Sequence, residues 1–551
     1  MRRRPAAALT GAVLLGALVA AAPRATAAAP VATLDIAIPG PFSGCDPSSP
    51  STSASTAAIL SLVLPSSFTM GPLAVPVGDT SVVAQAEVVN LSPQTVVYTI
   101  APNVAWPGGR PFAANDFVRT WLQRRDDRVV ADLGYRDIAY VHPNAAGSAV
   151  TVGFSAPYAD WESLFDLVVP PATHHASCAV PTAALDPSIG PYAIATSSST
   201  QVTLVANPAW SGAPRAYARV VVSANASSAP PPGHVPSAVY LPSPTLAELE
   251  AITSTGTFTS RLEHSTTVVS LDFAVRGRSA LPPAVRGAVA QLIDRVSILD
   301  QLATPIDYTV SPEVSHLFGQ GEPGYLGQPG VPVSAAVAPT LPIPGSTGAD
   351  AYGAGADVEA GDAALVAAGY AKSKAGWLTP AHQRFVTCLA VPADPALRPV
   401  ASLVAAQLTT QGIAVAWRSA PSVLDVAASL RNGTCTTGIV SRTGDGYVTH
   451  SGASWVPPTA PVPHDVTWTG VDDPIVTANA DAASAMLNPI EAQPSWNAMD
   501  ARLWDLMAGL PLFSPSIYEA WSPSIAGLLP CDSLAGFVGQ IPTLLPTAAT
   551  P

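Results

Sequence analysis

The sequence predicts a mixed α/β protein that forms either several domains or one large pair of lobes. Its 551 residues are enough to bury an extensive hydrophobic core. Several segments with the alternating pattern of half-buried strands are followed by segments with helical spacing. Hydrophobic residues make up 48% of the chain, and 58 prolines interrupt them. This composition is typical of a loop-rich globular protein with short elements.

The charge of the chain limits its partners. The formal net charge is −13, and only 11% of the residues are charged. We therefore expect no nucleic-acid partner and no anionic membrane surface, because no basic face is available to neutralise phosphates. No internal run is long enough to span a bilayer.

Residues 1–30 have the pattern of a secretory signal peptide. Arg2–Arg4 form a positive region, Ala6–Ala22 an apolar region, and Ala25–Ala27 an A-x-A cleavage site. A membrane anchor is the weaker interpretation, because small residues follow directly. No cysteine stands at the cleavage point, so we expect a secreted, extracytoplasmic protein associated with the cell envelope and without a lipid anchor.

The segment 95–121 predicts a strand, a tight turn and a helix in that order. Residues 95–100 alternate as in a half-buried strand. Pro107–Gly109 form a turn that needs the positive φ of glycine. Asn115 or Asp116 is placed to cap a helix that begins near Phe117. By themselves these features describe an ordinary strand–turn–helix.

Four later segments add further elements in order. A turn leads into a strand that a second strand follows, a strand precedes a helix, a helix ends at a glycine C-cap, and a long helix runs into a strand. In the second of these the helix is expected to bury Val285, Val289, Leu292 and Ile293 and to leave Asp294 and Arg295 near its solvent edge. The four segments are residues 187–210, 271–299, 362–370 and 398–415.

Residue by residue, the segment 95–121 resembles the signature of the extracellular solute-binding proteins of the peptide/nickel type, family 5. In that family a YTF strand precedes a hydrophobic position, a turn rich in Asp and Gly, a Pro and a [TA]-A-x-D-[VF] helix start. Pro107 replaces the usual Asp of the turn. The four later segments resemble further family segments in the same order. The matching residues here are Tyr98–Ile100, Trp106, Pro107–Gly109, Pro111 and Ala114–Phe117.

The resemblance implies a periplasmic-binding-protein-like α/β fold (type II, family 5) with two lobes that close around a ligand and an extra subdomain on lobe one. It also implies a monomer that binds a peptide or another small solute and delivers it to an ABC permease and ATPase complex. The boundaries it implies are 31–70, 186–268 and 508–551 for lobe one, 71–185 for the subdomain and 269–507 for lobe two.

Asp445 is the main candidate for contact with a ligand. It matches the Asp with which peptide-binding members of the family pair the α-ammonium group of their ligand, and a buried ammonium does need a charged partner. The alternative is that Asp445 and Gly446 only form a turn. Arg442 stands where the family usually has Trp. It could neutralise Asp445 or bind an anionic ligand itself.

Four aromatic residues are candidates for the wall of the ligand cleft: Tyr447, Trp455, Trp417 and Trp468. Such residues more often belong to the core or to surface packing.

Neither a metal site nor catalysis is expected. His174, His175 and Cys178 form an H-H-x-x-C cluster, but adjacent histidines on an extended chain point in opposite directions. The chain contains no G-x-S-x-G, H-E-x-x-H or P-loop motif. We therefore expect no cofactor and no enzymatic activity.

Five cysteines are present, and disulfides are expected outside the cytoplasm. Cys388 lies on an apolar strand and Cys435 precedes another, so we predict that these two pair. The pairing of Cys45, Cys178 and Cys531 stays open, with one thiol left over.

Two functions are compatible with the sequence. The first is a receptor that delivers a peptide or related solute to an ABC importer. The second is an envelope interaction protein with the same fold that imports nothing. The second is favoured by the missing lipid anchor, by the altered segment Arg442–Asp445 and by Ala274, where relatives often have Asn.

Overall fold

The computed structural model describes residues 32–47, 52–125, 134–168, 179–181, 188–225, 236–254, 258–308, 310–322, 355–457 and 468–547. The predicted signal peptide and the cluster of His174, His175 and Cys178 lie outside these ranges. Within them, no helix has both the length and the hydropathy that crossing a membrane requires.

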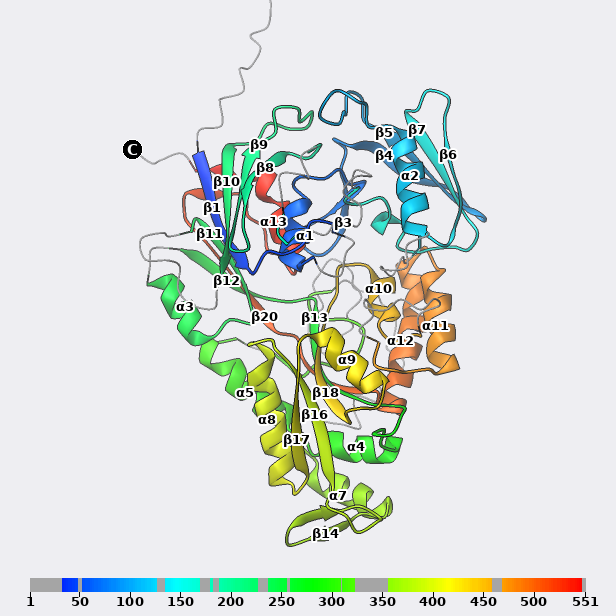
Figure 1. Cartoon of the computed structure of the whole chain (residues 1–551), viewed down its shortest axis with the longest axis vertical. Helices are drawn as coiled ribbons and strands as arrows, with labels where there is room; N and C mark the ends of the chain where they lie inside the picture. The colour runs from blue at the N-terminus through cyan, green and yellow to red at the C-terminus, as the bar shows by residue number, and fades with distance from the viewer. Residues whose placement is uncertain are drawn as a thin grey trace, which may run out of the picture.

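A seven-stranded sheet forms the core of the part that we call lobe one (Figure 1). Its central strand β1 (Ala32–Pro39) pairs in parallel with β10 and β11, while the outer strands pair antiparallel. Leu34, Ile36 and Ile38 of β1 are buried against α1 (Ala54–Leu60) and α13 (Leu534–Gly539). The sheet order is β12 (Thr259–His264), β20 (Ser516–Trp521), β11 (Ala238–Pro242), β1, β10 (Tyr217–Asn225), β9 (Gln201–Ala206) and β8 (Tyr192–Ser197).

Smaller elements complete lobe one. Helix α3 (Leu246–Thr253) begins at Thr245 with a capping box to Glu248. The short strands β21 (Ile525–Ala526) and β22 (Leu545–Pro546) pair with each other, and η4 (Ile541–Thr543) precedes β22.

A four-stranded antiparallel sheet with α2 (Ala114–Arg125) forms the subdomain, beside lobe one in Figure 1. The predicted strand–turn–helix is confirmed, because β5 is followed by Gly108 and Gly109 at φ of 88° and 84° and then by α2. The helix starts at Ala114 rather than near Phe117. The sheet order is β4 (Val83–Leu91), β5 (Gln94–Ile100), β7 (Ala149–Phe154) and β6 (Ile138–Pro143); the hairpin β2 (Phe68–Met70) and β3 (Pro76–Gly78) and the turn η1 (Trp161–Ser163) adjoin it.

Asp116 has a different role from the predicted N-cap. It lies inside the first turn of α2 with a fully buried side chain. Its carboxylate accepts a hydrogen bond from the backbone N–H of Ala113 at 2.9 Å and pairs with Arg110 and Arg119. Two cations and a backbone donor therefore compensate the buried charge.

A five-stranded sheet forms the core of the part that we call lobe two (Figure 1). The helices α8 (Leu397–Thr410) and α9 (Val423–Arg431) contact it. At its far end α7 (Val358–Ala367) packs on α4 and leads into the hairpin β14 (Ala371–Ser373) and β15 (Gly376–Leu378). The sheet order is β17 (Ala414–Ala420), β16 (Val386–Pro392), β18 (Thr437–Thr443), β13 (Thr267–Phe273) and β19 (Gly509–Phe513).

The single helix predicted over 285–299 is wrong. The chain forms α4 (Pro283–Gln291) and α5 (Arg295–Leu302), with η3 (Thr304–Ile306) after them. Asp294 caps α5, because its side chain accepts a hydrogen bond from the backbone N–H of Ser297. Arg295 is 2% exposed rather than near solvent, and its guanidinium donates to the carbonyl oxygens of Glu313 and Pro511. The four apolar residues predicted to face inward are buried.

Three further helices join lobe two to the subdomain: α10 (Val448–Ala453), α11 (Pro474–Ser484) and α12 (Pro489–Leu506). They share a core with Trp455 and Trp496 and lie directly below α2 in Figure 1. The carbonyl oxygen of Ser484 accepts a hydrogen bond from Ala159 of the subdomain at 2.7 Å. This helical layer therefore brings lobe two into contact with the subdomain.

The two large sheets are joined by adjacent chain crossings. One runs from β12 to β13 through Ser265 and Thr266, and the other from β19 to β20 through Ser514 and Pro515. Ser265 donates its N–H to the carbonyl of Pro515 at 3.2 Å. Strand β19, within the segment 508–551, pairs with β13 of lobe two. The boundaries implied by the resemblance stay predictions.

The predicted disulfide between Cys388 and Cys435 is confirmed, with Cα atoms 5.1 Å apart. Cys45 is also disulfide-bonded. Cys531 is a buried free thiol.

Candidate functional site

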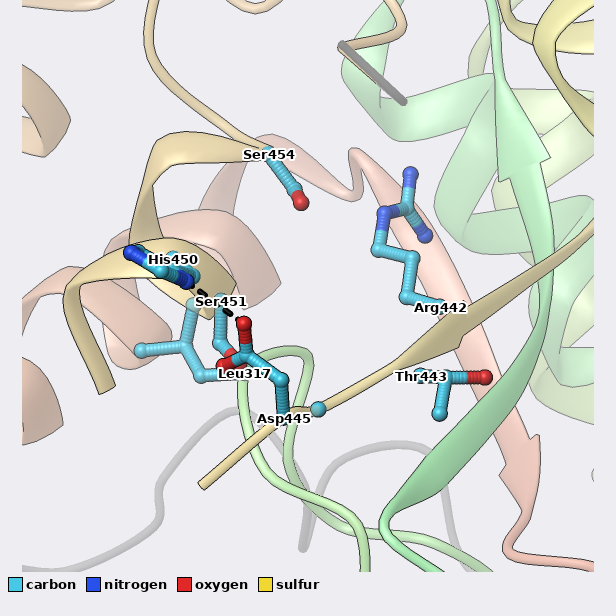
Figure 2. A pocket seen from close by; sticks show the side chains of 8 residues that line it. Leu317, Arg442, Thr443, Asp445, His450, Ser451 and Ser454 are labelled. Atoms are coloured by element: carbon cyan, nitrogen blue, oxygen red, sulfur yellow. Dashed lines mark hydrogen bonds and ion pairs between the residues drawn. The ribbon is translucent and has the colours of Figure 1, made fainter. Parts of the chain in front are cut away.

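A small pocket lies where β18 ends and α10 begins (Figure 2). Its volume is about 60 Å³. Of the predicted site residues, it brings together Arg442 and Asp445. The lining residues are Leu317, Arg442, Thr443, Gly444, Asp445, His450, Ser451 and Ser454.

Asp445 uses its two carboxylate oxygens for different purposes. One oxygen, Oδ1, accepts the backbone N–H of Tyr447 at 3.0 Å, and Gly446 has a φ of 85°, so the predicted turn is present. The other oxygen, Oδ2, lies 2.6 Å from Nδ1 of His450 (Figure 2). The Asp445 side chain is still 52% exposed. The turn and a charged contact are therefore compatible in one residue.

His450 is the partner of Asp445 that sequence reasoning missed. Burial disfavours its charged form, but the charge and hydrogen bond of Asp445, with the charges of Asp160 and Asp166, outweigh burial and raise the pKa of His450 to about 9. The imidazole is therefore protonated at neutral pH. No sequence pattern marks this pair, because its geometry depends on where α10 begins.

A buried carboxylate lies beside Asp445. Glu322 is 7% exposed; it accepts the N–H of Gly319 at 2.9 Å and the hydroxyl of Ser451 at 3.4 Å. Burial, together with the charge of Asp445, raises the pKa of Glu322 well above its usual value. Burial therefore favours the protonated, neutral form of Glu322 beside Asp445.

The subdomain closes one side of this region. Asp160 Oδ2 accepts both the backbone N–H of Thr449 at 2.7 Å and its hydroxyl at 2.6 Å. The hydroxyl of Tyr158 lies 3.3 Å from Nε2 of His450 and 3.3 Å from the Thr449 hydroxyl. These contacts place the candidate ligand carboxylate close to the junction between lobe two and the subdomain.

Arg442 pairs with Asp272, not with Asp445. Its guanidinium forms an ion pair with the fully buried carboxylate of Asp272 and donates to the Ser270 hydroxyl at 3.2 Å. It also lies 4.1 Å from the ring centroid of Trp455. The sequence left two roles open for Arg442, to neutralise Asp445 or to bind an anionic ligand. The structure shows a third role, in which the charge of Arg442 compensates the buried carboxylate of Asp272 on β13.

The candidate aromatic residues lie elsewhere. Trp455 is fully buried and donates its ring N–H to the carbonyl of His316 at 3.1 Å. Tyr447 is buried and donates its hydroxyl to the carbonyl of Glu162 at 3.2 Å. Trp468 is buried, and Trp417 is 49% exposed on the edge strand β17. None of the four lines the pocket of Figure 2, and a ligand role for them stays a prediction.

Metal ligands do not cluster in the part of the chain that the structure describes. There, no group of three or more His, Cys, Asp or Glu side chains is arranged to hold a metal ion.

Comparison with known proteins identifies relatives over most of the chain. The family model described as "Bacterial extracellular solute-binding proteins, family 5 Middle" matches residues 81–470. A curated relative is the probable monoacyl phosphatidylinositol tetramannoside-binding protein LpqW of Mycobacterium tuberculosis, 37% identical over 121 residues, which are 21% of this chain and 19% of that protein. The chain thus matches about a fifth of the length of this relative.

Solved structures show the same fold. The periplasmic EDTA-binding protein EppA matches 94% of this chain and 97% of its own, with a TM-score of 0.78 and 21% identity. The oligopeptide-binding protein AppA from Bacillus subtilis, in complex with a nonapeptide, matches 94% of this chain and 100% of its own, with a TM-score of 0.71 and 11% identity.

Proposed function

Because the chain belongs to the bacterial extracellular solute-binding proteins of family 5, we propose that it binds a small amine-bearing solute, such as a short peptide, and delivers it to an ABC importer. The two-lobed α/β fold suits this role, since a ligand held between lobes loses its water when they close. The protein acts by binding and release rather than by reaction. It works outside the cytoplasm after removal of residues 1–30.

The observation that carries the proposal is the position of Asp445. Its carboxylate lies in a pocket beside the junction of lobe two and the subdomain, and half of its side chain is still accessible. An ammonium group enclosed there would keep a charged partner, without which burial of a charge is very unfavourable.

The size of the pocket indicates how binding proceeds. Sites for drug-sized ligands occupy roughly 300–1,000 Å³, whereas this pocket has about 60 Å³. A peptide needs more room than this pocket offers, so we propose that the lobes separate to admit it. The related fold holds a nonapeptide in AppA and is that of an EDTA-binding protein in EppA, so it accommodates ligands of different size.

Isothermal titration with di- to hexapeptides tests the proposal. We expect free peptides to bind and their N-acetylated counterparts, which lack the ammonium group, to bind much more weakly. If no peptide in the series binds, the peptide assignment is wrong. Co-purification with a permease and an ATPase supports delivery to an importer, while recovery with other envelope proteins alone favours the non-transporting role.

A further inference from the structure

We propose that the protein holds itself closed without a solute through an interlobe latch, formed by Tyr158 and Asp160 of the subdomain and by Tyr447, Thr449 and His450 of lobe two. Within this latch the imidazole of His450 pairs with the carboxylate of Asp445. A cationic group of an incoming solute must displace His450 from this carboxylate. The displacement of His450 by a solute rests on the proposed binding of an amine-bearing solute. The closed resting state does not depend on that proposal.

The latch is a set of hydrogen bonds between parts of the chain that are far apart in sequence. Asp160 accepts two hydrogen bonds from Thr449, 289 residues away. One of them satisfies the second backbone N–H of α10, so the subdomain supplies a cap for a helix of lobe two. This helix has no side-chain cap of its own, because its N-cap residue is Tyr447.

Tyr158 and Tyr447 extend the contact from both sides. The hydroxyl of Tyr158, a 4% exposed residue, lies within 3.3 Å of both Thr449 and His450. In the opposite direction, Tyr447 donates its hydroxyl to the backbone of Glu162. These buried groups lose their partners when the lobes separate, which makes opening unfavourable until water replaces them.

His450 links the latch to the candidate ligand carboxylate. Its Nε2 faces Tyr158 of the subdomain, while its Nδ1 faces Asp445 at 2.6 Å. An imidazolium is therefore seated where the ammonium group of a solute would bind. Since a carboxylate oxygen engaged by one cation is less available to another, the solute competes with His450 for Asp445.

The charged groups around His450 determine how the latch responds to pH. The subdomain places Tyr158, Asp160 and Asp166 near the imidazole, and lobe two places Asp445 there. The pKa values of Asp160 and Asp166 are raised by burial, and His450 partly opposes this. Burial raises the pKa of Tyr158, so that its hydroxyl stays protonated in the range where His450 titrates. Rising pH therefore weakens the latch by removing the charge of His450.

Small-angle X-ray scattering of the unliganded protein tests the closed resting state. We expect the wild-type curve to match the closed structure, and Asp160→Ala and Tyr158→Phe to give a larger radius of gyration. Asp357→Ala is the matched control: Asp357 also caps a helix, α7, with its side chain, but that helix packs on α4 at the end of lobe two opposite the subdomain (Figure 1). Thermal unfolding checks that each variant folds. If Asp160→Ala does not fold, the milder variant Tyr158→Phe still tests the latch.

Two further measurements concern His450. Scattering of the wild type from about pH 7 to about pH 10 should show expansion as the imidazole loses its proton, and His450→Gln should be expanded throughout. With an alanine tripeptide as probe, titration calorimetry should give an apparent affinity about tenfold tighter for Asp160→Ala, because more of the protein is open.

The outcomes are distinct. A wild type that is already expanded without solute, or latch variants as compact as the control, overturns the latch. If the tripeptide binds no variant, the peptide function fails, while scattering still decides whether the latch exists. If the peptide binds all variants equally, the closed state does not oppose binding and the displacement of His450 is wrong.

Discussion

Oδ2 of Asp445 lies 2.6 Å from Nδ1 of His450, five residues further along the chain. The loop after β18 and the start of α10 hold these side chains face to face (Figure 2). The carboxylate is thus paired before any solute arrives, yet it stays half accessible. An exposed charge pair of this kind contributes little to stability, since water and salt screen it. The pair of Asp445 and His450 instead affects which other cationic groups can bind Asp445.

Replacement of Asp445 tests the ligand site directly. We expect Asp445→Ala to weaken binding of an amine-bearing peptide by roughly 2–5 kcal/mol, because the ammonium group loses its charged partner in the closed site. Titration calorimetry measures the change. Asp394→Ala is a suitable control, since Asp394 accepts the N–H of Ala396 in a similar turn but does not line the pocket. Equal affinities of both variants would leave Asp445 as a turn residue only.

The ion pair of Arg442 and Asp272 is expected to stabilise lobe two. Arg442→Met leaves the carboxylate of Asp272 buried without its cation, which lowers the free energy of unfolding by about 3–5 kcal/mol. The double variant Arg442→Met/Asp272→Leu should recover most of this loss, because neither charge remains. Urea unfolding measures both. A single variant as stable as the wild type would contradict a structural role for the pair.

The surroundings of Asp445 and the Arg442–Asp272 pair show which features of the site can be predicted from the sequence. The family resemblance predicts Asp445 as a ligand contact, which stays a prediction, and the Asp-Gly pair predicts its turn, which the structure contains. The partner of Arg442 was not foreseen, because Asp272 lies 170 residues away and meets Arg442 only through the pairing of β13 with β18. The register of two distant strands leaves no local pattern in a single sequence.

Local signals predicted the secondary structure better than the contacts between lobes. The Cys388–Cys435 pair followed from two strands in one sheet, and β5 with its turn and helix followed from periodicity. The break between α4 and α5 could have been predicted from the sequence, because Asp294 is a typical N-cap residue for the start of a second helix. The contact of Asp160 with Thr449 was not, since it depends on how two separate bodies are placed.

Removal of the Cys388–Cys435 disulfide should destabilise lobe two. The bridge closes a loop with a sequence separation of 47. Restriction of the unfolded chain by a loop of this length corresponds to about 4 kcal/mol at 25 °C. We expect Cys388→Ser/Cys435→Ser to lose about this much in denaturant unfolding. Cys531→Ser, which only exchanges the buried free thiol for a hydroxyl, should lose about 1 kcal/mol. Similar losses for both would show that the cross-link adds nothing.

Glu519 should make the stability of the protein depend on pH near neutrality. Its side chain is fully buried on β20 opposite Arg261 of β12, with which it forms an ion pair. Burial raises the pKa of Glu519 to about 7, although Arg261 partly opposes this, and the nearby charge of Glu263 adds to it. The folded state therefore holds a proton that the unfolded chain, with a usual glutamate pKa of about 4.3, releases earlier.

The sign of the effect follows from this difference. The contribution of a protonated Glu519 is fully present below about pH 4 and is lost as the pH rises through the folded-state pKa. We expect the free energy of unfolding to fall between about pH 4 and pH 7 with a slope of up to about 1.4 kcal/mol per pH unit from this group. Glu519→Gln cannot titrate, so the difference between its pH profile and that of the wild type isolates the contribution. Burial also raises the pKa of Asp532 to about 7, so this group titrates in the same range. The pH profile of Asp532→Asn is therefore measured as well, to separate the contribution of Asp532 from that of Glu519. Parallel profiles for wild type and Glu519→Gln would mean that Glu519 stays ionised when folded, with Arg261 outweighing burial.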